Sequence, residues 1–303
     1  MGQRVVIAGA SGLIGRALVS ELRARGWTVI RLVRAKAKRA DEVSWDPAAG
    51  VLDARALGRV DAVVNLSGEN IAAGRWTRAR RARIVESRTG SLRTLHHAIE
   101  ALPERPDVLV SASAVGIYGD RGDEVLTETS ARGSGFLPDV CETWETHAAK
   151  IADLGVRTVP LRSGVVLARE GGALKKLLPL FRAGLGGRVG NGHQWMSWIG
   201  LVDAVGAIMH AIENPQLSGP VNAVAPHAVT NLEFTRALAT ALRRPALLPV
   251  PAFALRLVFG QMAEETLLAS ARVEPVALLR SGYRFRQPQL EGALASVLQS
   301  GKL

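Results

Sequence analysis

Three glycines near the start of the chain have the spacing that a phosphate-binding turn requires. Gly9, Gly12 and Gly15 follow a short β-branched run, and an apolar helical pattern begins directly after them. Glycine lets the backbone turn tightly and lets a phosphate reach main-chain N–H groups with no Cβ in the way. The N-terminal end of the following helix directs its positive dipole at that phosphate. We therefore predict a dinucleotide-binding turn whose contacts come from Gly9, Ser11, Gly12, Leu13, Ile14 and Gly15.

The end of the second predicted strand indicates which dinucleotide binds. The strand covers residues 28–34 and ends in Val33 and Arg34, with Lys36 and Lys38 just beyond. In dinucleotide folds this position meets the adenosine ribose, and an acidic residue there receives the ribose hydroxyls of NAD. A guanidinium instead suits the 2′-phosphate of NADP, which a carboxylate would repel. The sequence thus favours NADP(H) over NAD(H).

Two further predicted strands end in small or polar residues. The strand over residues 61–68 ends in Leu66, Ser67 and Gly68, and small side chains there let the middle of a cofactor pass close to the backbone. The strand over residues 107–113 ends in Ser113, and Tyr118 follows it. These two hydroxyls are candidates to polarise a substrate carbonyl. The alternative is a strand-end serine that satisfies the backbone and a tyrosine ring in the core.

A long helix predicted over residues 77–101 is rich in arginine. Most of these side chains are expected to form a solvated face, whereas Arg88 is the one that we predict to reach an anion of the cofactor or substrate. A helix that binds nucleic acid through such a face would usually interleave aromatic side chains, which this one does not.

The alternation of predicted elements indicates an α/β fold. Strands and helices alternate from residue 4 to residue 161, including a helix that Pro138 opens and that runs to about Leu154. Such alternation predicts a Rossmann-like, doubly wound parallel sheet with right-handed crossovers. Ligands of these sheets bind at the carboxyl ends of the strands, where Gly9, Ser67 and Ser113 fall.

The composition of the sequence changes at Gly171, after which glycines become frequent. We predict a nucleotide-binding domain over residues 1–170, to which residues 197–226 return. Residues 171–196 and 227–303 are predicted to form a smaller, mainly helical substrate lobe. Trp195 and Trp198 are candidates to line a substrate cleft; the alternative is a packed loop that attaches the lobe. Helices are expected over residues 202–212, 230–241, 251–259 and 289–298.

Composition and charge restrict the class of protein. Of 303 residues, 48% are hydrophobic and 21% are charged, which favours a folded, enzyme-like chain. The net charge is +11, and 32 of the 38 basic residues are arginines scattered over many helices. We interpret this charge as a solvated basic surface. The alternatives are that it attracts an anionic small ligand, nucleic acid or an acidic membrane surface.

Cysteine and histidine usage argues against disulfides and metals. Cys141 is the only cysteine, so the chain cannot form an intramolecular disulfide, and a reducing compartment fits. The adjacent His96 and His97 are expected to point in different directions on their helix, and we predict no metal site.

The start of the chain reads as a strand rather than a signal peptide, and the apolar stretch 245–260 is too short to span a bilayer. We expect a cytoplasmic protein without a membrane partner.

Several motifs resemble those of the extended short-chain dehydrogenase/reductase superfamily. The glycine turn, the strand end at Ser67 and the segment from Ser111 to Gly119 carry this likeness. The segments 68–70, 75–77, 161–167, 171–174 and 194–199 look like its atypical branch, the sugar-nucleotide epimerase-like proteins of the NAD-dependent epimerase/dehydratase superfamily. The resemblance covers nearly the whole chain and implies a Rossmann-like fold, a C-terminal helical domain and bound NADP(H). It also implies that Gly164 and Val165 line the path of the cofactor.

The chain departs from that superfamily at its proton-transfer pair. Typical members use Tyr-x-x-x-Lys on one helix face, where the lysine lowers the pKa of the tyrosine. Here Gly122 and Gln287 stand four residues after the only tyrosines, and the corresponding helix positions look to be Cys141 and Glu145. Glu145 is a candidate general base, whereas no cation near Cys141 in sequence would activate its thiol.

Two classes of function therefore stay open. One is an NADP(H)-dependent oxidoreductase or epimerase-like enzyme in which Ser113 with Tyr118, or Glu145, handles the proton. The other is a protein that senses NADP(H) without turnover. The sequence argues against binding of nucleic acid. It leaves the substrate and the oligomeric state open.

Overall fold

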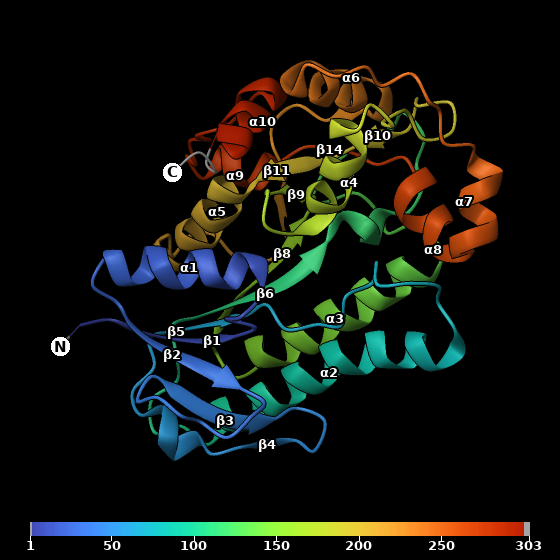
Figure 1. Ribbon diagram of the computed structural model, residues 1–303. Helices are drawn as coiled ribbons and strands as arrows, with labels where there is room; N and C mark the ends of the chain where they lie inside the picture. The colour runs from blue at the N-terminus through green and yellow to red at the C-terminus, as the bar shows by residue number, and fades with distance from the viewer. Residues whose placement is uncertain (1, 300–303) are drawn as a thin grey trace.

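The computed structural model describes residues 2–299 and has an eight-stranded sheet at its centre (Figure 1). Its strands run in the order β12-β8-β6-β5-β1-β2-β3-β4. All neighbours pair in parallel except β3 and β4. The strands are β1 Arg4–Ala8, β2 Thr28–Val33, β3 Glu42–Asp46, β4 Val51–Leu52, β5 Ala62–Asn65, β6 Val108–Ala114, β8 Arg157–Ser163 and β12 Val221–Ala223.

Helices cover both faces of this sheet, which confirms the predicted doubly wound α/β class. Helices α1 (Leu13–Ala24) and α5 (Leu201–Glu213) pack together on one face, and α2 (Arg78–Glu100) and α3 (Phe136–Ala152) pack together on the other. Each face has its own apolar core. The strand order reverses on the two sides of β1, and ligands of such sheets bind at this switch point.

The C-terminal part of the chain is mainly helical and packs beside β9 (Val165–Leu167) and β11 (Trp198–Gly200) (Figure 1). Three of its helices, α4 (Gly172–Arg182), α6 (Asn231–Leu242) and α10 (Leu290–Gln299), pack around a separate core that includes Leu174, Phe234 and Leu294. The helices are α4 Gly172–Arg182, α6 Asn231–Leu242, α7 Ala252–Phe259, α8 Gln261–Ala263, α9 Val276–Arg280 and α10 Leu290–Gln299.

Short strands and turns connect the two parts. Three two-stranded ladders pair β9 (Val165–Leu167) with β11 (Trp198–Gly200), β10 (Trp195–Met196) with β13 (Val229–Thr230), and β7 (Val125–Leu126) with β14 (Arg272–Val273). Single helical turns occupy η1 Ala54–Leu57, η2 Val115–Tyr118 and η3 Glu264–Leu268.

Two predicted element boundaries shift for identifiable reasons. The helix predicted to open at Pro138 begins at Phe136, because the carboxylate of Glu265 accepts the backbone N–H groups of Phe136 and Leu137. Proline is tolerated in this first turn, where its missing N–H removes no helical bond. The strand predicted to end at Leu161 continues to Ser163 through a buried arginine, Arg162.

Candidate functional site

The glycine turn after β1 is shaped by close backbone contacts. A Cβ on Gly9, whose φ is +82°, would lie 2.7 Å from the carbonyl of Leu66, and a Cβ on Gly15 would lie 2.8 Å from the Cα of Ala10 and overlap the oxygen of Gly9. Only glycine therefore fits at these two places. The N–H of Gly12 donates to the oxygen of Gly9 (3.0 Å) and α1 starts at Leu13 with no side-chain cap. The first N–H groups of α1 are thus left without intrahelical acceptors, as an anion site requires.

The end of β5 lies directly beside this turn. The N–H of Leu66 donates to the oxygen of Ala8 (2.9 Å), which ties β5 to β1. Fully buried Asn65 donates to Ser91 (3.1 Å) and accepts bonds from the N–H (3.2 Å) and hydroxyl of Ser67. These bonds fix the backbone of Leu66 and Ser67 at the switch point of the sheet.

Arg34 stands just beyond β2 with its guanidinium in solvent. Among residues 2–299 it takes part in no hydrogen bond or ion pair. Arg31 in the same strand is different, because it is held by Asp41 (2.8 Å) and Glu42 (3.0 Å). Half-buried Val33 completes the strand end. Of these two arginines, Arg34 is the one that can take an external anion.

Arg88 is a largely desolvated cation. Its Nη1 donates to the oxygens of Ile84 (2.9 Å) and Glu69 (3.2 Å), and its guanidinium lies 4.8 Å from the ring centre of Trp144. It also lies 3.3 Å from where a Cβ of Gly68 would be. Burial lowers the pKa of Arg88, and no carboxylate among residues 2–299 forms an ion pair with it. A buried charge without a paired partner is costly, so this position is suited to an anionic ligand.

A buried ion pair joins the middle of α3 to the ends of β6 and β8. The hydroxyl of Ser113 donates to Oε1 of Glu145 (2.6 Å). Arg162 holds the same carboxylate with two bonds, from Nε to Oε1 and from Nη2 to Oε2, both 2.8 Å long. Hydrogen bonds from this bidentate pairing outweigh burial and raise the pKa of Arg162. The side chain of Glu145 is thus held between the guanidinium of Arg162 and the hydroxyl of Ser113.

Tyr118 joins this cluster from its far side. Its ring is fully buried, and its hydroxyl accepts a bond from Nη1 of Arg162 (2.9 Å) and donates to Oδ1 of Asn222 (2.7 Å). Asn222 in turn donates to the oxygen of Glu274 (3.0 Å). Burial raises the pKa of Tyr118, although Arg162 and Asn222 oppose the shift. The hydroxyl of Tyr118 therefore contacts the cluster through Arg162 and is not exposed to solvent.

Cys141 lies on α3 one turn before Glu145 and is 3% exposed. Burial, with a smaller effect of Glu145, raises the pKa of its thiol from 9.0 to about 12. The sequence suggested no nearby cation, but the fold brings Arg88 and Arg162 close enough to oppose this rise. Their effect is the smaller one, so the thiol stays protonated at neutral pH.

Gly164 and Val165 connect β8 to the C-terminal part. A Cβ on Gly164 would lie 2.5 Å from the oxygen of Ser197, and the N–H of Val165 donates to that oxygen (2.8 Å). Of the two tryptophans, Trp198 begins β11 and is 1% exposed in the C-terminal core, so it packs in that core and does not line a cleft. Trp195 is half-buried, and its indole N–H donates to Asp123 (2.7 Å).

His96 and His97 do not separate as their positions in the sequence suggested. Their rings meet edge to face with centroids 5.5 Å apart, and their nitrogens lie within 4.8 Å of one another and of a carboxylate oxygen of Glu100. The group lies on the outer part of α2, with His97 and Glu100 exposed.

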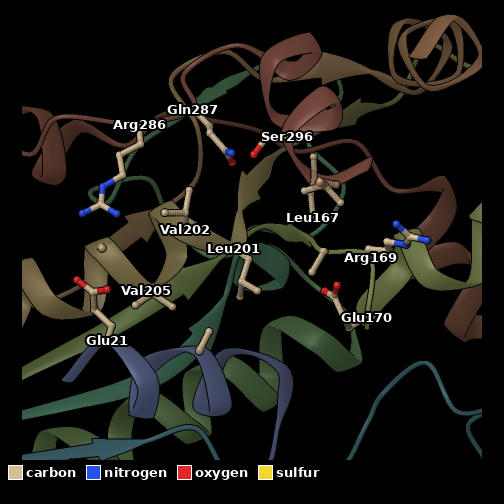
Figure 2. Close-up of a pocket in the computed structure, with 14 residues that line it drawn as sticks. Glu21, Leu167, Arg169, Glu170, Leu201, Val202, Val205, Arg286, Gln287 and Ser296 are labelled. Carbon is tan, nitrogen blue, oxygen red and sulfur yellow. The ribbon is translucent and has the colours of Figure 1, made fainter. Parts of the chain in front are cut away.

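The structure also contains a cavity of about 330 Å³ that shares no residue with the predicted site (Figure 2). Glu21 of α1, Leu201 and Val205 of α5, and Arg286 from the C-terminal segment are among its walls. The predicted site is instead defined by backbone and charge at the carboxyl edge of the sheet. Within residues 2–299 no helix is long and apolar enough to cross a bilayer.

Sequence reasoning missed Arg162, Asn222 and Asn65 as parts of this site. A signal for Arg162 was present, since an arginine inside an otherwise apolar parallel strand needs a buried partner. No comparable local signal marks Asn222, whose role depends on a contact with Tyr118 across 104 positions.

Comparison with known proteins places these features in a family context. A family model described as the NAD dependent epimerase/dehydratase family matches residues 5–225, and a domain of unknown function, DUF1731, matches residues 250–297. Epimerase family protein Mb2239 of Mycobacterium bovis is 45% identical over 96% of both chains. The crystal structure of the human epimerase family protein SDR39U1 (isoform 2) with NADPH superposes with a TM-score of 0.89 at 35% identity, over 97% of this chain and 99% of that one. A nucleoside-diphosphate sugar epimerase from Corynebacterium glutamicum gives 0.82 at 37% identity, over 98% of this chain and 58% of that one.

Proposed function

The chain belongs to the NAD dependent epimerase/dehydratase family, and on this basis we propose that it is an NADP(H)-dependent oxidoreductase or epimerase-like enzyme. The observation that carries the proposal is the glycine turn, where Gly9 and Gly15 lie too close to neighbouring backbone to carry a Cβ, beside helix N–H groups without intrahelical acceptors. The human relative whose structure contains NADPH supports the choice of cofactor.

The residues around the switch point fit the parts of NADP(H). Ser11, Gly12, Leu13 and Ile14, at the start of α1, would hold the pyrophosphate. Arg34 would bind the 2′-phosphate beside Val33, because its guanidinium has no competing partner among residues 2–299. The remaining predicted contacts are Leu66, Ser67, Gly68, Arg88, Gly164 and Val165.

When bound, NADP(H) would supply or accept a hydride, and the protein must then move a proton. The hydroxyl of Ser113 already donates to Glu145, so its oxygen can accept a proton from a substrate hydroxyl while its own proton passes to the carboxylate. Glu145 is held for this by Arg162. Tyr118 would support the relay through its bond to Arg162 rather than by touching the substrate.

A second candidate is an NADP(H) sensor without turnover. It is favoured by one observation, which is that every side chain that could replace the tyrosine and lysine is engaged or protected. Glu145 is paired with Arg162, Tyr118 is fully buried and Cys141 is a protonated thiol. In this alternative the same cluster would only hold the cofactor-binding edge in shape.

The experiment for the cofactor is a fluorescence titration with NADPH and NADH. We expect NADPH to bind more tightly, and Arg34→Ala to weaken NADPH by at least about tenfold while it leaves NADH unchanged. Arg39→Ala is the matched control, since Arg39 is exposed in the same basic segment and should have little effect. No response to either nucleotide would reject the proposal.

The experiment for turnover separates the enzyme from the sensor. Sugar nucleotides and small carbonyl compounds are screened for oxidation of NADPH, and active substrates are then tested with Ser113→Ala and Glu145→Gln. Turnover that these variants abolish, with NADPH binding retained, would reject the sensor.

The two parts of the chain would have different roles. Residues 1–170 and 197–226 would bind the cofactor, and residues 171–196 and 227–303 would contribute the substrate side. The substrate is a small molecule of unknown class. The cytoplasmic location and the absence of a membrane or nucleic-acid partner stay predictions.

A further inference from the structure

A basic groove of about 740 Å³ lies in the C-terminal part, between α6 and the segment that follows it. Four of its lining residues are the arginines Arg188, Arg236, Arg243 and Arg244, and none of its lining residues is acidic. The groove shares no residue with the proposed cofactor site.

The charge of these four guanidiniums is not compensated by the protein. Within residues 2–299 none of the four side chains takes part in a hydrogen bond or ion pair. The sequence around them has the same bias, since residues 171–196 and 227–303 contain 13 basic and 5 acidic residues, against 25 and 22 in the rest of the chain. The C-terminal part therefore carries most of the net positive charge of the protein, and four of its arginines line the groove.

Arg243 provides a second, independent observation. It ends α6 with φ 54° and ψ 45°, and it is the only residue other than glycine with a positive φ in the described part of the chain. The N–H of Arg244 donates to the oxygen of Ala239 (3.0 Å), the pattern of a helix end that usually has glycine at this position. A Cβ makes this conformation unfavourable, yet the side chain gains no hydrogen bond or ion pair with any described residue in return.

The helix dipole does not account for the whole group. A cation at the carboxyl end of α6 is favourable, which covers Arg243 and Arg244. Arg236 lies in the middle of α6, however, and Arg188 comes from a separate loop whose backbone pairs with Val250. Four guanidiniums from three places around one groove indicate a ligand with several negative charges.

We propose that this groove binds a phosphate-bearing ligand that also has an apolar portion. Planar guanidiniums match phosphate oxygens with paired hydrogen bonds. The apolar portion would contact Leu232 and Leu247, the latter being 82% exposed on the groove wall. A second copy of this chain would present the same positive charge and is disfavoured as the occupant. The groove has no aromatic lining residue on which nucleic-acid bases would stack.

The test uses tripolyphosphate, ATP, a DNA duplex, and vesicles of phosphatidylcholine with and without phosphatidylglycerol, each with and without saturating NADPH. Binding of ATP or tripolyphosphate identifies a free ligand, and binding only to vesicles that contain phosphatidylglycerol identifies a lipid headgroup. Either result supports the proposal if it persists with NADPH present. Binding that NADPH abolishes, binding of a DNA duplex alone, or no binding to any probe would overturn it.

Variants assign the binding to the groove. We expect Arg236→Ala/Arg244→Ala to raise the dissociation constant by at least about tenfold, because each lost charged contact has about that effect. The control Arg280→Ala/Arg284→Ala changes two exposed arginines elsewhere in the same part of the chain and should stay within about twofold. Equal losses in the two double variants would show that only net charge matters and would overturn the proposal.

Arg243→Gly gives a readout that a purely structural role would not give. Glycine relaxes the positive φ, so thermal stability should be unchanged or higher while binding weakens several-fold. If stability falls and binding is unchanged, Arg243 serves the helix end and not a ligand.

Discussion

Arg88 and Arg162 are both buried on the carboxyl side of the sheet, but the protein treats their charges differently. Burial acts to lower the pKa of both guanidiniums. For Arg162 the bidentate bonds to Glu145 more than offset it, and the pKa rises. For Arg88 the partners are backbone oxygens and the ring of Trp144, and the pKa falls.

This difference separates a charge that serves the fold from one available to a ligand. Arg162 connects Glu145, Tyr118 and the oxygen of Glu128 within the protein, so its removal leaves partners unsatisfied. Arg88 forms no ion pair with a carboxylate in the described part of the chain, so its removal leaves no carboxylate there without its cation. An anion that binds beside Gly68 would gain from a guanidinium that is already desolvated and held in place.

The largest expected effect is loss of stability in Arg162→Met. Glu145 would remain a buried carboxylate without its cation, which typically destabilises a protein by about 3–5 kcal/mol. Chemical denaturation measures the change in free energy of unfolding. Adding Glu145→Gln should restore part of the loss, and a single variant as stable as the parent would contradict the structural role of Arg162.

Arg88→Met should weaken binding of the cofactor more than it lowers stability. We expect the free energy of unfolding to change by about 1 kcal/mol or less, because only bonds to backbone oxygens and a ring contact are lost. The affinity for NADPH should fall by at least about tenfold. A stability loss as large as that of Arg162→Met, with cofactor affinity retained, would remove the contrast between the two arginines.

Ser113→Ala tests how far Arg162 alone holds Glu145. The carboxylate keeps both bonds to Arg162, so a loss of about 1 kcal/mol in the free energy of unfolding is expected. NADPH binding should be retained. A loss as large as that of Arg162→Met would mean that the serine and not the arginine holds the carboxylate.

Alkaline pH gives the smallest effect and tests whether burial raises the pKa of Cys141, which lies between the two arginines. The thiol has an ordinary pKa of 9.0 when exposed and about 12 in the fold, so between these values the unfolded chain releases a proton that the folded chain keeps. Stability from this group is therefore complete below pH 9 and is lost as the pH rises toward 12. Cys141→Ala should lose less stability than the parent over this range, as followed by denaturation at each pH. Equal curves for the two proteins would contradict the raised pKa.

Much of the fold could be predicted from local patterns. The helix predicted over residues 77–101 corresponds to Arg78–Glu100, and the strands before Gly9, Arg34 and Ser67 lie where apolar runs and glycines indicated. The helix Val276–Arg280 was missed, since five residues carry too little periodicity to be distinguished from a loop. The end of β8 was placed too early, because Arg162 has the charge of a strand end and its partner Glu145 comes from another element.

The sequence by itself determined the glycine turn, the basic end of the second strand and the absence of a Tyr-x-x-x-Lys pair, because each is a matter of residue type at fixed short spacing. Only the tertiary structure decided which arginine is paired. Arg88 and Arg162 look equally charged in the sequence, but the contact between Glu145 and Arg162 spans two elements. The energy of a buried charge depends on what surrounds it in space, and no local pattern contains that information.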